Sequence, residues 1–236
     1  MKPEIIKDDK TAVVVGCEGF VGEHLLALLN QHHSYINVKA ISQKKIKMGL
    51  SKVDYYVASI PSIEFKQWKA NDLFICYDAS FFNSGGKYKI AESEYKYIPK
   101  MILKAFRSGM GQVILLSSKG TSSDALFHIS RARGLIEEVV INMGFWSTHV
   151  FKPSILLGES INQKWGQGIA DRIGGKIDQY TGGWLKKNKP IEAEVVAKAM
   201  LHVAQRLVAG NHTYSSEWLQ DFAVSPEINS VSKTKK

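Results

Sequence analysis

The stretch "TAVVVGCEGFVGEHLLALL", residues 11–29, joins an apolar run to a leucine-rich run through Gly16, Gly19 and Gly22. The first run is typical of a parallel strand that is buried on both faces. The leucines of the second run share one broad face, which predicts a helix ending near His32 or His33. Strand, glycine array and helix in this order predict a turn whose backbone N–H groups meet a pyrophosphate at the positive end of the helix dipole.

The same alternation of strand-like and helix-like patterns continues along the chain. We expect further strands within residues 36–42, 53–59, 71–80, 112–118, 147–158 and 212–219, and helices within residues 91–109, 124–144 and 190–210. Strands that alternate with helices pair in parallel through right-handed crossovers. The sequence therefore predicts an α/β fold, with a doubly wound, mainly parallel Rossmann-type sheet and helices on both faces.

The domain organisation follows from length and composition. The chain has 236 residues, of which 44% are hydrophobic, enough for one large α/β domain with a continuous core. We expect this domain to span residues 1–222, with a glycine-rich flap at 164–185 over the carboxyl edge of the sheet. Residues 223–236 are expected to form a flexible basic tail.

Charge and cysteine content limit the partners. The net charge of +9 would suit nucleic acid, an anionic membrane or a phosphorylated ligand, but the lysines are scattered, so nucleic-acid binding is not favoured. No apolar run is long enough to span a membrane, and residues 1–10 lack the apolar core of a signal peptide, so we expect a cytoplasmic location and no membrane partner. Cys17 and Cys76 lie in apolar runs, which favours buried thiols and a reducing compartment. The histidines and cysteines lack the spacing of a metal site.

The charged residues near the glycine array give opposing indications of cofactor. Lys44 and Lys45 follow the second strand, where an acid would bind the adenosine ribose and basic groups would accept a 2′-phosphate, so they favour NADP over NAD. Glu18 and Asp78 bring carboxylates to the same edge and oppose phosphate, unless they face ribose hydroxyls. A ribose-facing Glu18 would favour NAD. The expected cofactor is NADP or NAD, with NADP slightly preferred, and a site without cofactor is the alternative.

Several blocks together resemble a known family. "VVVGCEGFVGEHLLALL", "DLFICYDAS", "QVILLSSKGTSSDALFHISRARGLIEEVV", "FKPSILLGE" and "IEAEVVAKAM" are similar, in this order, to atypical short-chain dehydrogenase/reductases, most of all to their Tat-interacting-protein-like branch. The resemblance covers roughly residues 11–222. It implies a Rossmann core, a bound dinucleotide and, in active members, a constellation of serine, tyrosine and lysine.

The resemblance assigns candidate catalytic residues and also departs from the family pattern. Ser117 and Ser118 end the fifth strand, where the family serine lies. On the helix that follows, the family pairs a tyrosine with a lysine one turn later, so that the phenol exchanges a proton with the carbonyl oxygen. The "RGL" block here places Arg133 at the lysine position and Ile129 at the tyrosine position. Isoleucine cannot donate a proton.

Cofactor contacts are expected around the carboxyl edge of the sheet. Lys152 and Pro153 occupy a turn where the family commonly has Arg-Pro against the nicotinamide end of the cofactor. The complete set of expected cofactor-binding residues is Gly16, Glu18, Gly19, Phe20, Val21, Gly22, Lys44, Lys45, Tyr77, Asp78, Lys152 and Pro153.

Three functions are compatible with these residues. The first is a dinucleotide-binding sensor or scaffold, and loss of the tyrosine favours it. The second is a working NAD(P)-dependent oxidoreductase that acts on a carbonyl or alcohol with a replacement proton donor. The third is a degenerate fold that binds no dinucleotide and acts through protein contacts. A protein partner or a second copy of the chain is compatible with the first and third.

Overall fold

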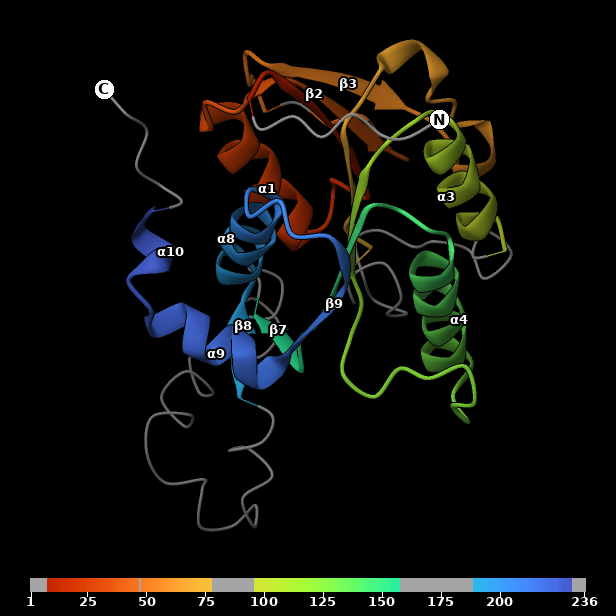
Figure 1. Ribbon diagram of the computed structural model, residues 1–236, viewed down its shortest axis with the longest axis vertical. Coiled ribbons are helices and arrows are strands. Elements are labelled where there is room, and N and C mark those ends of the chain that lie inside the picture. Colours follow the sequence, from red (N-terminus) through yellow and green to blue (C-terminus); the bar gives the residue numbers. More distant parts are fainter. Residues whose placement is uncertain (1–7, 47, 78–95, 158–188, 231–236) are drawn as a thin grey trace.

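The computed structural model describes residues 8–46, 48–77, 96–157 and 189–230 (Figure 1). Its centre is a parallel sheet of seven strands in the order β3-β2-β1-β4-β5-β6-β9. The strands are β1 (Lys10–Val15), β2 (Tyr35–Ser42), β3 (Val53–Val57), β4 (Asp72–Ile75), β5 (Gln112–Leu116), β6 (Ser147–Lys152) and β9 (Gly210–Ser215). This single-domain α/β architecture confirms the predicted doubly wound fold.

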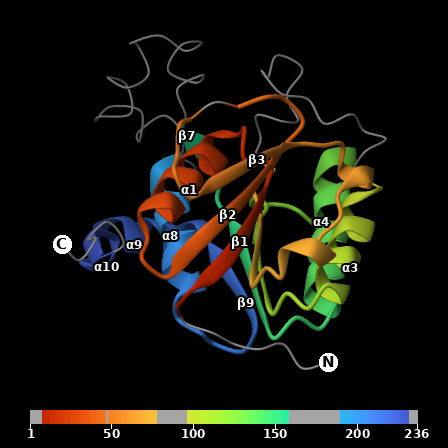
Figure 2. The same cartoon turned by 90° about the horizontal axis from the view of Figure 1, so that it is seen from above.

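Helices cover both faces of the sheet. Helices α1 (Phe20–Gln31) and α8 (Ala193–Ala204) lie on one side, while α3 (Ile98–Arg107) and α4 (His128–Asn142) lie on the other (Figure 2). Two short 3-10 turns, η1 (Ile60–Ser62) and η2 (Lys66–Trp68), connect β3 to β4.

Each face has its own apolar core. Leu25, Leu29 and Met200 are among the fully buried residues of the α1/α8 face, and Ile102 and Val140 among those of the α3/α4 face. Both cores meet strands such as β1, in which Ala12 to Val15 are fully buried on alternating sides. The uninterrupted apolar run of this strand is therefore explained by burial on both faces.

Strand β6 is shorter than the sequence predicts. The expected strand at 147–158 ends at Lys152, and Ile155–Leu157 forms a separate strand, β7, that pairs with β8 (Pro190–Glu192) in a second, two-stranded sheet. Because Pro153 has no N–H to donate, it ends the ladder of β6 at this point.

Helix α8 is also shorter than the expected helix at 190–210. It begins at Ala193, after β8, and ends at Ala204. The carbonyl oxygen of Ala204 accepts hydrogen bonds from Lys10 Nζ at 3.1 Å and Gln112 Nε2 at 3.0 Å. Donors from the sheet thus satisfy the last carbonyl, and Leu207, with φ of 49°, turns the chain away from the helical path.

Residues 210–230, which follow α8, also differ from the prediction. The expected strand at 212–219 is divided between β9 and helix α9 (Ser216–Val224), which begins where Ser215 Oγ accepts from the N–H of Trp218. Helix α10 (Glu227–Ser230) follows within the segment expected to be a tail, and His202 Nε2 lies 3.2 Å from Glu227. Residues 231–236 lie outside the described part of the chain.

Several buried polar side chains contact one another at the amino edge of the sheet. Lys10 Nζ lies 2.6 Å from the Asp72 carboxylate, to which the Tyr35 hydroxyl also donates at 2.5 Å. We call Lys10, Tyr35, Asp72 and Gln112 the amino-edge cluster. It joins β1, β2, β4 and β5 to the end of α8 through the Ala204 carbonyl.

Candidate functional site

The glycine turn connects β1 to α1 at the carboxyl edge of the sheet. Gly16 has φ of +75°, and a Cβ there would lie 2.8 Å from the Tyr77 ring. A Cβ on Gly22 would lie 2.6 Å from Cys17 Cα and 2.7 Å from the Gly16 carbonyl oxygen. Both positions therefore require glycine, the first for its left-handed conformation as well, and the second because α1 approaches the turn so closely.

Three contacts fasten this turn to the end of β2. The Gly16 N–H donates to the Ile41 carbonyl at 3.2 Å, and the Cys17 thiol points to the same carbonyl at 3.3 Å. The carboxylate of Glu18 accepts from the Gln43 N–H at 2.9 Å. Burial raises the pKa of the Cys17 thiol, which keeps it protonated and able to donate.

Glu18 is therefore placed at the end of β2 although it belongs to the turn. Its side chain is buried, with 2% of the residue exposed. Lys44 and Lys45, the residues expected to favour a 2′-phosphate, follow Gln43 and are exposed. The carboxylate of Glu18 is thus fixed at the end of β2 by a hydrogen bond, whereas the side chains of Lys44 and Lys45 lie on the surface. The contact with Gln43 spans 25 positions and has no local sequence signal.

Of the remaining residues of the turn, Gly19 caps the helix that follows, and Phe20 and Val21 pack in the apolar core. Gly19 is the N-cap of α1, so the first N–H groups of this helix face the turn. Val21 is fully buried and Phe20 is half-buried, and both belong to the apolar core of the α1/α8 face. Their side chains contribute packing at the position where the sequence predicted cofactor contacts.

At the end of β4, Tyr77 connects the glycine turn to α4. The Tyr77 ring packs beside Gly16, and its carbonyl oxygen accepts from Arg133 Nη2 at 3.2 Å. Arg133, which the resemblance predicts at the lysine position, is 8% exposed and reaches from α4 to the end of β4. Asp78 and the expected flap at 164–185 lie outside the described residues.

A second buried polar group lies where β5, α4 and β6 meet. The hydroxyls of Ser117 and Thr121 both donate to Glu137 Oε1, and Lys152 Nζ lies 2.9 Å from Glu137 Oε2. Lys152 also donates to the Thr121 carbonyl at 3.3 Å. We call Ser117, Thr121, Glu137 and Lys152 the carboxyl-edge cluster.

Sequence reasoning found two members of this cluster and missed the other two. Glu137 lies one helical turn after Arg133 on the buried side of α4, so helical spacing from Arg133 was the signal that could have found it. Thr121 lies in the loop after β5, and no pattern marks it. That loop is held against α4 at Gly134, where a Cβ would lie 2.1 Å from the Ser122 carbonyl carbon.

Other predicted residues lie around the cluster without joining it. Ser118 is half-buried beside Ser117, and the Pro153 carbonyl accepts from the Lys119 N–H at 2.8 Å, which ties the β5 loop to the turn after β6. Ile129 is in the first turn of α4 with 42% of its surface exposed. Ile129, which the resemblance predicts at the tyrosine position, therefore presents an apolar side chain to the outside.

A cavity of about 290 Å³, open solvent included, lies beside the carboxyl-edge cluster. Ile75 and Tyr77 of the β4 end, Leu115 of β5, and Ile98 and Ile136 of the two covering helices form its apolar wall. Ser117 and Arg133 form its polar corner. The cavity therefore joins a hydroxyl and a guanidinium to an apolar interior at the edge where doubly wound sheets bind ligands.

Two kinds of feature are absent from the described residues, namely membrane-spanning helices and metal-binding clusters. No described helix combines the length and apolar character that crossing a membrane requires. Within the described ranges, no group of three or more histidine, cysteine, aspartate or glutamate side chains is arranged to hold a metal ion.

Fungal proteins are similar to the chain in sequence. No protein-family model matches the chain. "Protein fmp52-1, mitochondrial" of Aspergillus terreus is 27% identical over 216 residues, covering 88% of this chain and 92% of the relative. "Protein FMP52, mitochondrial" of Debaryomyces hansenii is 26% identical over 201 residues, covering 82% of this chain and 87% of the relative. These names overturn the expected cytoplasmic location, because they assign the relatives to mitochondria.

Solved structures that are similar in fold include proteins in complex with NAD. WbmF of Bordetella bronchiseptica, in complex with NAD+, superposes with a TM-score of 0.59 at 14% identity, covering 97% of this chain and 81% of that one. The 3-oxoacyl-[acyl-carrier protein] reductase of Brucella melitensis, in complex with NAD, gives 0.57 at 13% identity, covering 91% and 99%. At the level of fold, these neighbours confirm the resemblance to short-chain dehydrogenase/reductase and epimerase-like proteins.

Proposed function

We propose that the carboxyl edge of the sheet binds a nicotinamide dinucleotide and that the chain acts as a cofactor-binding sensor or scaffold. The observation that carries this proposal is the glycine turn, which brings the N-terminus of α1 to the carboxyl edge between β1 and β4. A helix N-terminus that follows such a turn offers N–H groups and a favourable dipole to a pyrophosphate. The residues present fit the group.

Glu18 supports NAD as the cofactor in preference to NADP. Its carboxylate lies at the end of β2, where an acid accepts from the adenosine ribose hydroxyls of NAD. A 2′-phosphate at the same place would meet a like charge, and two unit charges 4 Å apart repel by about 4 kcal/mol near a protein surface. This argument reverses the preference for NADP that Lys44 and Lys45 suggested.

The position of Arg133 fits the ribose next to the nicotinamide. Its guanidinium reaches the end of β4, one strand from the glycine turn, and can donate to ribose hydroxyls as the family lysine does. The exposed Ile129 supports a binding role, because no proton can be exchanged at that position. A bound nicotinamide would supply hydride chemistry, and this chain would need another donor to use it.

A working oxidoreductase is the second candidate, and Tyr77 favours it. Among the described tyrosines, Tyr77 is the one that lines the same cavity as Ser117 and Arg133. If its phenol replaces the missing donor, a Tyr77→Phe variant will bind the dinucleotide and lose turnover. If the chain is a sensor, neither the parent nor this variant will oxidise NADH against a panel of carbonyl compounds.

The test is calorimetric titration of the protein with NAD and NADP. We expect NAD to bind at least about tenfold more tightly than NADP, and Glu18→Gln, which keeps an acceptor for Gln43, to reduce that ratio to within about threefold. Glu23→Gln is the matched control, because Glu23 is exposed in the first turn of α1. Absence of binding by either nucleotide would overturn the proposal in favour of a fold that acts only through protein contacts.

Lys44 and Lys45 provide a second check on the same preference. Because both side chains are exposed and screened by salt, the double change to glutamine will alter the affinity for NAD by less than about twofold. A loss of tenfold or more would show that the lysines, and not Glu18, set the cofactor.

We also propose that the chain acts in mitochondria, on the strength of the names of its fungal relatives. Cell fractionation with a mitochondrial and a cytosolic marker tests this directly. Recovery of the chain with the cytosolic marker alone would overturn it.

A further inference from the structure

Helix α9 begins at the carboxyl edge of the sheet, because it directly follows the parallel strand β9 (Figure 1). Its first turn contacts the loop after β5, where Lys119 Nζ lies 3.0 Å from Glu217 Oε1. The same turn contacts the turn after β6, because the Ser216 hydroxyl donates to Ser154 Oγ at 2.9 Å. These contacts span 98 and 62 positions, so they depend on the fold and not on local sequence.

The middle of α9 is joined to the segment that leads into β8. Gln220 Nε2 donates to the Lys189 carbonyl oxygen at 3.0 Å, and the Ser154 hydroxyl donates to the same oxygen at 2.9 Å. Ser154 therefore accepts a hydrogen bond from α9 and donates one to the start of β8. The loop after β5, the turn after β6 and the start of β8 thus all contact α9.

Apolar packing holds the later turns of α9, whereas polar contacts hold its first turn. Leu219 and Phe222 are buried in the core of the α1/α8 face. In the first turn, the side chains of Lys119 and Glu217 are 40% and 61% exposed, and exposed ion pairs contribute little to stability. Ser216 is buried, so movement of Ser154 would leave its hydroxyl without that hydrogen bond, which is unfavourable. The first turn therefore docks firmly when the loops beside it are held in place.

The two loops that contact this first turn also carry side chains of the carboxyl-edge cluster. Thr121 follows Lys119 by two residues, and Lys152 lies directly before Pro153. The Lys119 N–H donates to the Pro153 carbonyl at 2.8 Å, which joins the two loops to each other. Lys152 and Pro153 are among the residues that the sequence predicts to contact the cofactor. A ligand that fixes either loop would thus also fix the partners of α9.

We propose that NAD at the carboxyl edge regulates the docking of α9, because it holds the two loops against the first turn of this helix. Without NAD, the first turn opens more often. The inference rests on the proposed function and specifies its regulation, since it names the element through which a sensor would report a bound cofactor. Coupling between two binding events is reciprocal, so the factor by which NAD suppresses opening of α9 is also the factor by which undocking of α9 weakens NAD.

The experiment is hydrogen exchange of the full chain with and without saturating NAD, followed by mass spectrometry. We expect peptides that cover residues 216–224 to exchange at least about fivefold more slowly with NAD. The double variant Ser216→Ala and Glu217→Gln removes both contacts of the first turn. Its α9 peptides should exchange equally fast with and without NAD, and calorimetry should show NAD binding weakened by the factor that separates the two exchange rates of the parent.

Asp221→Asn is the control, because Asp221 is exposed on the same helix, and it should retain the protection by NAD and the affinity of the parent. If the double variant does not fold, Glu217→Gln alone keeps the buried Ser216 and should still reduce the protection, whereas undiminished protection would overturn the proposal. NAD that binds in calorimetry and leaves the exchange of residues 216–224 unchanged would overturn the regulation of α9 alone. Absence of NAD binding by the parent would instead overturn the proposed function.

Discussion

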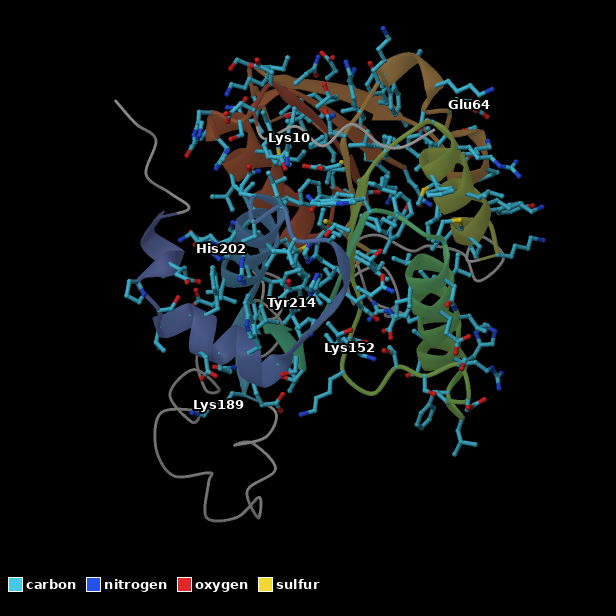
Figure 3. All side chains as sticks on the ribbon, viewed as in Figure 1. Lys10, Glu64, Lys152, Lys189, His202 and Tyr214 are labelled. Atoms are coloured by element: carbon cyan, nitrogen blue, oxygen red, sulfur yellow. The ribbon has the colours of Figure 1, made fainter. Side chains whose placement is uncertain are left out.

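The two edges of the central sheet each bury a lysine beside a carboxylate, yet they differ in what surrounds the pair. At the amino edge, Lys10 and Asp72 are 1% and 5% exposed and are closed in by the Ala204 carbonyl. At the carboxyl edge, Lys152 and Glu137 are 24% and 10% exposed and adjoin a cavity. Figure 3 labels Lys10 and Lys152, which lie far apart in the molecule.

The two clusters differ in what they hold in place. Every partner of the amino-edge cluster that we describe comes from the strands or from α8, so its hydrogen bonds hold elements together. The carboxyl-edge cluster instead orients Ser117 at the wall of a cavity. A buried ion pair therefore indicates function only in combination with its position on the sheet.

The largest expected effect comes from breaking the amino-edge pair. Asp72→Ala removes the counter-charge of the buried Lys10 ammonium, which keeps the Ala204 carbonyl as a partner, and the carboxylate acceptor of the Tyr35 hydroxyl, and it should lower the free energy of unfolding by about 3–5 kcal/mol. Urea denaturation measures this loss. Affinity for NAD should stay unchanged under conditions where the variant is folded.

The matched control for Asp72 is Asp54, which pairs with Lys39 at 2.5 Å but is 54% exposed. Asp54→Ala should cost less than about 1 kcal/mol, because solvent screens the pair. If Asp72→Ala is too unstable to purify, Asp72→Asn serves in its place and should still cost more than Asp54→Ala. Equal losses at the two positions would contradict a structural role for the buried pair.

A smaller loss of stability is expected at the carboxyl edge. Glu137→Gln removes the charge that faces Lys152 and leaves an amide for Ser117 and Thr121, which should cost about 1–3 kcal/mol by urea denaturation. The cost stays below that of Asp72→Ala because Lys152 can turn towards solvent.

Glu138→Gln is the control for Glu137, because Glu138 is the exposed neighbour on the same helix. It should leave the free energy of unfolding unchanged. Equal losses for Glu137→Gln and Glu138→Gln would contradict a stabilising role for the carboxyl-edge cluster.

The first half of the fold could be predicted because its signals are local. The strand β1, the glycine turn and α1 follow one another within residues 10–31, so periodicity and glycine spacing suffice. The small sheet of β7 and β8 joins residues 155–157 to 190–192, and no pattern within either three-residue strand encodes this pairing. The same reason explains the end of α8, which depends on donors from Lys10 and Gln112.

The candidate site divides in the same way. Gly16, Gly22, Ser117 and Arg133 could be found because family spacing and backbone requirements mark them. The partner of Glu18 could not be found in this way, because the donor is the backbone N–H of Gln43, which any residue could supply, and Gln43 follows β2, which is distant in sequence from the glycine turn. Helical spacing places Glu137 on the same face of α4 as Arg133, but its hydrogen-bond partners come from the packing of α4 against β5 and β6, which the sequence does not encode locally.

His149 differs from the lysine–carboxylate pairs at the two edges. It is a buried titratable side chain whose hydrogen-bond partners are hydroxyls and not a charged group. It is 1% exposed; its Nδ1 lies 2.9 Å from the Tyr214 hydroxyl and its Nε2 lies 2.9 Å from Ser147 Oγ. Ser147 donates to the Val208 carbonyl at 2.5 Å, so it accepts from Nε2–H, and Nδ1 accepts from Tyr214. Burial, with repulsion from His212 and Arg206, lowers the pKa of His149 to about 3.

This shift predicts a stability that depends on pH. The unfolded chain protonates His149 near pH 6.5 and the folded chain only near pH 3, so the contribution is present above pH 6.5 and is lost as the pH falls towards 3. The slope from this group approaches about 1.4 kcal/mol per pH unit within that window. His149→Gln should lose that part of the slope in urea denaturation between pH 6.5 and 4. The control is His212→Gln, because His212 stacks on His149 but is half-buried, and this variant should keep most of the slope. Equal slopes for the parent and His149→Gln would mean that the buried imidazole accepts a proton without opening the β6–β9 edge.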